Sequence, residues 1–417
     1  FWLSYLDALI KLDKLVDARR IIKKAENQGI KGDVFGDLKK RLNPINQDLD
    51  EQSTKKLLDV AINLRELGKF DQAIDLVKKE IDSAPKNPDL HAFLSHCYIL
   101  NDNLKKADTH LNAAKEINPN VASVGWNEVR ILLKKKDVMD ALNVARKFTE
   151  LFPKDVEGMG ILGSCLLANN NIEESIVFLD KAIELDQSYA EAYFNRGLVK
   201  LSKQETSSAL DDLEKAYEIK PHIYQVWPIL ASIYLGNNNF EKAEKFYKRL
   251  VQKEPLNEKY FFSLGICQQR QGEFESAIDS YTKAIKIKPD YSEAYTNIGT
   301  LHSNSGDQEK AIEIYEKAIK IKKDYIALNN LGFIYSNINE QDKAITNYQK
   351  AINIKPDFAE AYINIGNSLV ATGNPKLALE NFNKAIKIKP NSPELYNNVA
   401  NVYSIIGDLR ESIRSYK

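Results

Sequence analysis

The sequence is poor in the residues that carry covalent or metal chemistry. Of its 417 residues, three are cysteine, five are histidine and two are methionine. Three cysteines are too few for a disulfide framework. The histidines show no metal-ligand spacing, and the chain has neither a phosphate-binding loop nor a dinucleotide-binding glycine motif. The sequence therefore predicts a chain with no catalytic site, no metal site and no cofactor.

Two further absences limit the partners. The formal net charge is +0, with 58 basic and 58 acidic residues, which argues against binding to nucleic acid or to a membrane surface through bulk charge. No apolar run approaches the ~18 residues of a membrane span. No signal-peptide pattern follows Phe1. These features predict a cytoplasmic protein, and the excess of lysine over arginine, with much isoleucine and asparagine, favours a bacterial origin.

What the sequence does contain is a repeated stretch, best seen at residues 359–392, AEAYINIGNSLVATGNPKLALENFNKAIKIKPNS. Its first half has a helical spacing of i, i+3, i+4 and i+7, occupied by Tyr362, Ile365, Gly366 and Leu369. Gly373 interrupts this run, Pro375 suits the first turn of a second helix, and Pro390 ends that helix. The stretch predicts a helical hairpin that needs a copy of itself on either side to bury its faces.

Those copies run through most of the chain. With Ala359 as position 1, repeats begin at residues 54, 88, 122, 156, 190, 224, 258, 292, 325, 359 and 393. Every step is 34 residues except the 33 between Ser292 and Tyr325. Position 20 is always alanine or serine, and position 32 is proline in eight of the ten complete repeats. The cysteines all occupy position 10, where we expect small packing residues: Cys97, Cys165 and Cys267.

This pattern resembles the tetratricopeptide repeat family in its period, its small residues at positions 8 and 20, its aromatic residue at position 24 and its proline at position 32. The resemblance implies an all-α, right-handed superhelical solenoid of antiparallel helix-turn-helix repeats. It also implies that the first helix of each repeat lines a concave inner groove. Members of this family mostly bind other proteins, so we expect a protein or an extended peptide as the partner.

The repeats divide the chain into regions. Residues 1–42 predict a divergent N-terminal hairpin with a short helix, and the polar residues 43–53 predict a linker. Residues 54–189 hold irregular repeats, in which the repeat at 122–155 departs most, with Gly125 and Glu128 at positions where large apolar residues are expected and Phe148 in place of alanine. Residues 190–417 are near the consensus, with a truncated last repeat, and both ends of the sequence are expected to continue in a longer chain.

The last repeat has no following helix to cover it. We therefore expect an exposed apolar end and self-association through this uncapped C-terminal repeat. The residues expected to be exposed are Val399, Val402, Tyr403, Ile406 and Ile413.

Asparagine recurs at position 6 of the first helices. The set comprises Asn195, Asn297, Asn330, Asn364 and Asn398, with Asn329, Asn367 and Asn401 at neighbouring positions. A carboxamide offers both a donor and an acceptor, so a row of them can hold a peptide backbone of any sequence. The row resembles the asparagine ladder in the repeat domain of O-linked N-acetylglucosamine transferases, and implies a peptide-binding groove. Ile229 and Ser263 interrupt it, and the alternative is that exposed positions in an asparagine-rich chain simply carry polar residues.

Three functions follow from these patterns. The first is a non-enzymatic scaffold that binds proteins or peptides in its concave groove. The second is the substrate-recruiting arm of a larger glycosyltransferase-like or sulfotransferase-like enzyme, whose catalytic domain would follow Lys417. The third is a structural scaffold that binds through its convex face or its exposed end. Position 5 never carries lysine, which argues against a clamp for the C-terminal carboxylate of a partner.

Overall fold

The computed structural model describes residue 18, residue 21, residues 54–65 and residues 67–416. The predicted N-terminal hairpin and the linker at 43–53 lie outside the described residues, apart from Ala18 and Ile21. The chain divides into two units, which comprise residues 1–223 and 224–417 and are described separately below. The described residues of both units form helices and turns and contain no β-strand.

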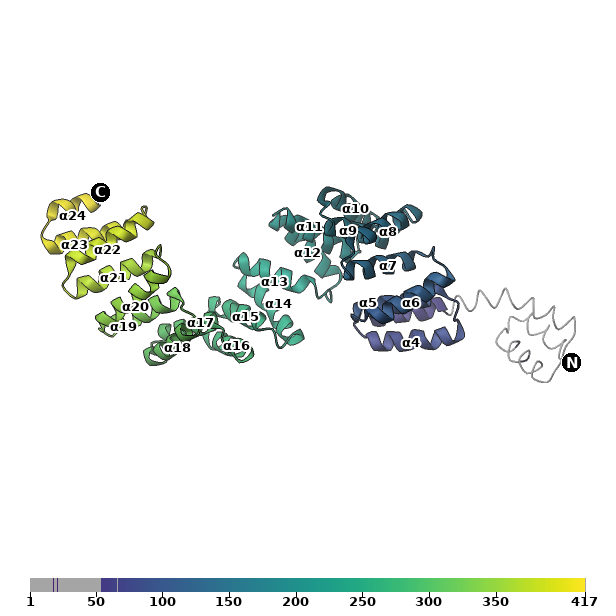
Figure 1. Ribbon diagram of the computed structural model, residues 1–417, viewed down its shortest axis with the longest axis horizontal. Helices are drawn as coiled ribbons and strands as arrows, with labels where there is room; N and C mark the ends of the chain where they lie inside the picture. Colours follow the sequence, from purple (N-terminus) through teal and green to yellow (C-terminus); the bar gives the residue numbers. More distant parts are fainter. Residues whose placement is uncertain (1–17, 19–20, 22–53, 66, 417) are drawn as a thin grey trace. The chain divides into compact units, whose positions relative to one another are not determined.

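Unit 1 is a series of helical hairpins stacked in chain order (Figure 1). After a helical segment at 54–65, its helices are α4 (Phe70–Ser83), α5 (Pro88–Leu100), α6 (Leu104–Ile117), α7 (Ala122–Lys134), α8 (Val138–Leu151), α9 (Val156–Ala168), α10 (Ile172–Leu185), α11 (Ala190–Ser202) and α12 (Thr206–Ile219).

Unit 2 continues with the same motif (Figure 1). Its helices are α13 (Val226–Gly236), α14 (Phe240–Lys253), α15 (Glu258–Arg270), α16 (Phe274–Ile287), α17 (Ser292–Asn304), α18 (Gln308–Ile321), α19 (Tyr325–Asn337), α20 (Gln341–Ile354), α21 (Ala359–Ala371), α22 (Pro375–Ile388), α23 (Pro393–Ile406) and α24 (Leu409–Tyr416).

The first helices begin where the repeat register predicts, with one exception. Helix α13 begins at Val226, two residues after the expected Tyr224. Pro228 has no N–H to donate to the carbonyl of Tyr224, so the first α-helical hydrogen bond of that repeat is missing. The N–H of Trp227 instead donates to the Tyr224 carbonyl over 3.1 Å, in a tighter turn.

Small residues bring the two helices of each hairpin close together, as the pattern at positions 8, 20 and 24 predicts. A Cβ atom on Gly366 would lie 2.6 Å from the ring of Phe382, and one on Gly299 would lie 2.8 Å from the ring of Tyr315. Where serine replaces alanine at position 20, its hydroxyl bonds to the backbone across the crossing. Ser175 Oγ donates to the carbonyl of Gly163 over 2.7 Å.

The turn inside each described hairpin contains one residue in the left-handed region, always at position 15. Glycine fills this position at Gly68, Gly272, Gly306, Gly373 and Gly407. In the other repeats a residue with a side chain adopts the same conformation: Asp102, Lys136, Asn170, Gln204, Asn238 and Asn339. Because a Cβ atom is unfavourable at positive φ, the turn imposes this conformation even where the residue does not favour it.

The expectation for the last repeat is only partly correct. Val399 and Val402 are buried, because they pack on Phe382 of the preceding α22, so their predicted exposure is wrong. Ile406 and Ile413 are exposed as expected, and Leu409 beside them is exposed too.

First helices of consecutive repeats lie next to one another. In unit 1 this holds for α5, α7, α9 and α11, and in unit 2 for α17, α19 and α21. The outward-facing residues of α17, α19, α21 and α23 are called the first-helix face of unit 2 below. This face carries most of the predicted asparagine residues.

Candidate functional site

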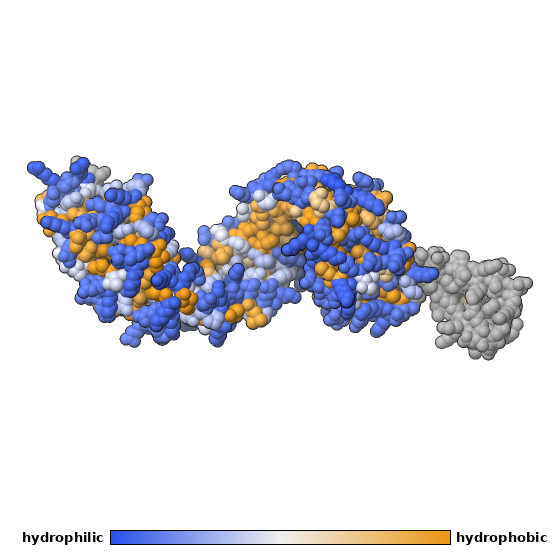
Figure 2. Space-filling model, in the orientation of Figure 1, coloured by the Kyte–Doolittle hydropathy of each residue, from blue (hydrophilic) through white to orange (hydrophobic). Residues whose placement is uncertain are grey.

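The periodicity of each first helix determines which of its side chains the first-helix face presents. On α19, Ala327, Leu328 and Leu331 are buried in the hairpin core. The opposite side of the helix presents Ile326, Asn329, Asn330 and Phe333, at spacings of three, four and seven residues. Figure 2 shows hydrophobic patches among hydrophilic residues over the C-terminal helices of unit 2. The face is therefore a mixture of carboxamides and apolar side chains.

Lysine and arginine are absent from the helices that make this face, and His302 is the one basic side chain on them. Helices α17, α19, α21 and α23 contain no lysine or arginine, whereas their partner helices α18, α20 and α22 carry lysine and α24 carries arginine. The acidic residues in the first turns of α17 and α21 have lysine partners, Glu293 with Lys322 at 2.9 Å and Glu360 with Lys389 at 2.5 Å. The hydrogen bond from Lys322 lowers the pKa of Glu293. Glu394 adds one further carboxylate.

The carboxamides at position 6 contact the preceding first helix. Asn330 Nδ2 donates to Thr300 Oγ1 over 3.5 Å, and Asn364 Nδ2 donates to Asn329 Oδ1 over 3.0 Å. In unit 1, Asn195 Nδ2 donates to Ser164 Oγ over 2.7 Å. These bonds cross the boundary between neighbouring repeats, so the position-6 carboxamides are anchored from one side.

A second set of contacts connects position 6 to the tyrosine at position 24 of the preceding repeat. The hydroxyl of Tyr281 donates to Gln269 Oε1 over 2.7 Å, and that of Tyr315 pairs with Thr300 Oγ1 over 2.9 Å. Burial raises the pKa of both tyrosines, and the nearby carboxamides of Asn297 and Asn330 partly oppose the shift. Ser263, which interrupts the asparagine row, acts on Tyr247 in the same way. Position 6 therefore adds a polar neighbour to a buried hydroxyl in these three repeats.

These bonds leave acceptor capacity on the face. The Oδ1 atoms of Asn330 and Asn364 have no hydrogen-bond partner among the residues that the structure describes. A carboxamide oxygen has two lone pairs, and here the amide nitrogen of the same group is already held. Each of these two side chains can therefore accept an N–H from a ligand without first being ordered.

The structure places seven of the eight predicted residues on one row of helices. Asn297, Asn330 and Asn364 are half-buried at position 6, as is Asn398, and Asn329 is half-buried beside them. The side chains of two others on this row are exposed: Asn367 and Asn401. Asn195 lies in unit 1, so it does not share a unit with the other seven.

Sequence reasoning missed two apolar residues on the same face. Ile326 and Phe333 of α19 are 43% and 50% exposed, which is unusual for large hydrophobic side chains. The signal that could have found Ile326 is its position: the neighbouring repeats carry Glu293 and Glu360 there. Ile326 thus stands at an outward-facing position where the neighbouring repeats have glutamate. This exchange indicates a side chain that contacts a ligand rather than solvent.

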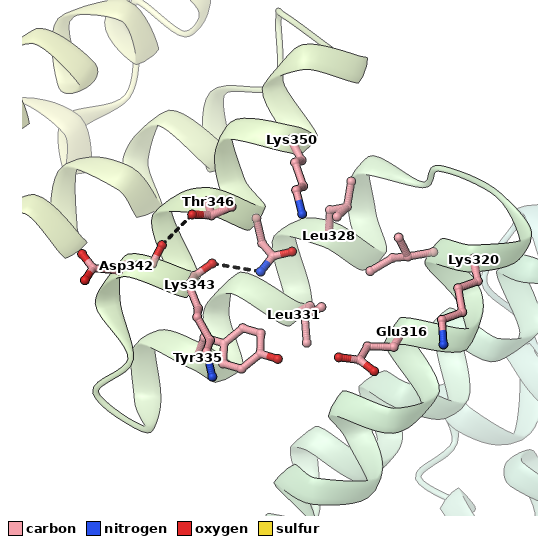
Figure 3. A pocket seen from close by; sticks show the side chains of 11 residues that line it. Glu316, Lys320, Leu328, Leu331, Tyr335, Asp342, Lys343, Thr346 and Lys350 are labelled. Carbon is pink, nitrogen blue, oxygen red and sulfur yellow. Dashed lines mark hydrogen bonds between the residues drawn. The ribbon is translucent and has the colours of Figure 1, made fainter.

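A separate hollow lies between the second helices α18 and α20, over α19 (Figure 3). Its volume is about 570 Å³, and Leu328 and Leu331 contribute its apolar lining. Asn347 Nδ2 donates to the carbonyl of Lys343 over 2.9 Å, so this carboxamide is bound to its own helix. The hollow contains none of the predicted asparagines and does not belong to the first-helix face.

The described part of the chain has neither a candidate metal site nor a candidate membrane span. None of its His, Cys, Asp and Glu side chains form a group of three or more that could hold a metal ion. Within the same residues, no helix combines the length and the apolar character that crossing a bilayer requires.

The chain is similar in sequence to several proteins of known name. Over 195 residues the chain is 23% identical to the mitochondrial import receptor subunit TOM70 of Mus musculus, a match that covers 44% of this chain and 32% of that protein. It is 24% identical over 206 residues to the BBSome complex member BBS4 of Bos taurus, covering 49% of this chain and 40% of that one. The chain thus spans well under half the length of these relatives.

Among solved structures, the chain is similar to YrrB, described as a TPR protein with an unusual peptide-binding site. The identity is 26%, the TM-score is 0.42, and the match covers 44% of this chain and 95% of that one.

Family models match repeats in both units. A model described as TPR repeat matches residues 163–204, 270–306, 337–373 and 366–407. Models described as tetratricopeptide repeat match residues 64–125, 190–223, 224–253 and 292–325. With helical hairpins at these positions and the small residues of the repeat at their crossings, the chain is a member of the tetratricopeptide repeat family.

Proposed function

We propose that this chain is a scaffold that binds extended polypeptide segments on the first-helix face of unit 2. The observation that carries the proposal is the anchored carboxamide row. Neighbouring repeats hold the amide groups of Asn330 and Asn364, while their Oδ1 atoms have no partner within the described residues. Such fixed acceptors suit the backbone N–H groups of an extended chain, which recur whatever its sequence.

The composition of the face supports the same ligand class. With no lysine or arginine on α17, α19, α21 or α23, the face offers little attraction to a polyanion such as a nucleic acid. TOM70, to which the chain is similar, is named as an import receptor subunit, which is consistent with a role in holding other polypeptides. Binding, without a chemical step in this chain, is the function that these features support best.

The experiment is binding of a fluorescent library of random unfolded peptides to the whole chain and to the double variant Asn330→Ala/Asn364→Ala. Losing two hydrogen bonds that each contribute ~0.5–1.5 kcal/mol should weaken binding about tenfold or more. Helicity should stay that of the wild type. Equal affinity in the double variant would remove the carboxamide row from the proposal.

A control separates ligand contact from loss of the bonds between repeats. Thr300→Val removes the hydroxyl to which Asn330 donates but keeps the carboxamide. If the row binds peptide, this variant should lose only the part of the affinity that the anchor contributes, and it should bind more tightly than the alanine variant. Equal losses in both would mean that the asparagines act only through the repeat stack.

The transferase-arm hypothesis gains no support from the fold or from the relatives named above, and it stays a prediction from the sequence. Self-association through the C-terminal repeat and a cytoplasmic location are likewise predictions from the sequence. Leu409 and Ile413 are exposed, and a measurement of the oligomeric state would test the predicted self-association.

A further inference from the structure

A recurring ion pair lies at the N-terminal ends of the first helices. In three repeats the glutamate at position 2 pairs with the lysine at position 31 of the same repeat. The pairs are Glu191 with Lys220, Glu293 with Lys322, and Glu360 with Lys389, with N–O distances of 2.9, 2.9 and 2.5 Å. The carboxylate in each pair comes from the first helix and the ammonium from the end of the second helix.

The repeat that begins at Tyr325 keeps the lysine but lacks the carboxylate. Ile326 occupies position 2 and Lys355 occupies position 31. Within the described residues, no carboxylate lies within 4.0 Å of the Lys355 ammonium, the limit for an ion pair. Lys355 Nζ instead lies 3.5 Å from the hydroxyl of Tyr325 and 4.8 Å from the centre of that ring. The ring contact fixes where the ammonium is but does not neutralise it.

The same repeat presents the exposed apolar side chains of the face. Ile326 and Phe333 are seven residues apart on α19, about 10 Å along the helix axis at the α-helical rise. Asn329 and Asn330 lie between them. Lys355 acts on Glu360 only at longer range, where its charge adds to the hydrogen bond from Lys389 that lowers the pKa of that carboxyl. An ammonium with no carboxylate at ion-pair distance thus lies in the same repeat as two exposed hydrophobic side chains and the carboxamide row.

We propose that this part of the face selects, in a bound extended polypeptide, an Asp or Glu that lies within two residues of a bulky apolar residue. The ligand carboxylate takes the place that Glu293 and Glu360 occupy beside their own lysines, and the apolar side chain covers Ile326 or Phe333. The inference rests on the proposed function and adds to it a selectivity for the sequence of the bound polypeptide.

The carboxylate is assigned to a side chain rather than to a chain end. Carboxamides continue on both sides of α19, with Asn297 on α17 and Asn364 on α21. A polypeptide that spans this row therefore passes α19 in both directions, and a chain that ended there would leave half of the row uncovered.

The test compares labelled peptides of one uncharged extended host sequence that differ only in a central Asp-x-Leu, Asn-x-Leu or Asp-x-Ser. The wild-type chain should bind the first about tenfold more tightly than either of the others, since the second peptide lacks the ion pair and the third lacks the apolar contact. The variant Ile326→Glu gives this repeat the carboxylate that its neighbours have. It should fold normally and lose the tenfold preference while still binding all three peptides.

Lysine variants provide the matched control. Lys355→Met should remove the preference for Asp over Asn, whereas Lys322→Met changes a lysine at the same repeat position that already has Glu293 as its partner. The second variant should keep the preference.

The outcomes separate the two proposals. Equal binding of the three peptides, with affinity still lost in Asn330→Ala/Asn364→Ala, would overturn the selectivity and leave the proposed function standing. Binding only of peptides that end at the leucine with a free carboxylate would also overturn it, because the site would then recognise a chain end. Failure of every peptide to bind would overturn both.

Discussion

The ring of Phe148 occupies the space that Gly125 leaves open: a Cβ atom on Gly125 would lie 2.3 Å from Phe148 Cδ1. In the next repeat the sizes are reversed, with Met159 at the position of Gly125 and Ala182 at that of Phe148. The irregular repeat at 122–155 has therefore exchanged a large and a small residue across one helix crossing.

The exchange predicts a strong coupling between the two positions. Phe148→Ala should destabilise the hairpin by about 3–5 kcal/mol through the cavity it leaves, and Gly125→Leu should destabilise it through overlap with the ring. The double variant restores the arrangement of the neighbouring repeats and should recover most of either loss. Hydrogen exchange of α7 and α8 in the whole chain measures this, and simple additivity would contradict it.

Unit 1 should lose stability in mild acid because of His96. Its pKa lies well below 6.5, first because of burial and then because of the nearby cations Arg130, Arg65 and Lys220. Arg65 Nη1 lies 2.9 Å from His96 Nδ1, an arrangement that requires the neutral ring to accept. The unfolded chain takes up the proton first, so the free energy of unfolding should fall as the pH drops below about 6.5, until the folded pKa is reached.

The check is urea denaturation of the whole chain between pH 7 and pH 5, monitored in unit 1. His96→Gln cannot take up this proton and should show a flatter dependence on pH. The same slope in both proteins would assign the acid sensitivity to other groups.

Much of the fold could be predicted from the sequence because a few positions repeat through the whole array. Glycine or alanine at position 8 and an aromatic ring at position 24 predicted the crossing that Gly366 and Phe382 make. The compensation between Gly125 and Phe148 was not predicted, since the two residues are on different helices and each looks like a defect alone. The contact between Tyr281 and Asn297 was not predicted, because a polar residue at position 6 can either face solvent or lie beside a buried hydroxyl.

The turn residues offer a way to stabilise unit 1. Lys136 and Gln204 have φ of 66° and 63°, a conformation that is unfavourable for residues with a side chain. Replacing either with glycine should raise stability by about 0.5–1 kcal/mol, since the relief of strain exceeds the entropy that glycine adds to the unfolded chain.

The matched control for this prediction is Gly306→Ala in unit 2. Gly306 has φ of 84° and no atom within 4 Å of an added Cβ, so strain alone should lower stability, by about 1 kcal/mol. Thermal melts of the three variants check the pair of predictions. A loss on Lys136→Gly would mean that the lysine side chain contributes more than its backbone strain removes.

The three cysteines should be inert in the folded protein. All are fully buried, and burial raises the pKa of Cys97 to about 11 and those of Cys165 and Cys267 to about 12. At neutral pH, alkylation should therefore require local opening of the hairpin, with rates that rise in sub-denaturing urea. Mass spectrometry of peptides from iodoacetamide-treated protein gives a rate for each site, and rates in buffer equal to those of the unfolded chain would contradict the prediction.

The contact between position 6 and the preceding tyrosine gives the array a defined order. Asn297 acts on Tyr281 and Ser263 on Tyr247, whereas Leu213 at the same position is followed by Ile229. A rearranged chain that placed the repeat of Ile229 after that of Tyr281 would leave this hydroxyl only its partner Gln269, which belongs to its own repeat. The repeats are therefore alike in shape but not fully interchangeable, and a shortened or permuted array keeps these contacts only if Tyr247 and Tyr281 move together with the repeats that follow them.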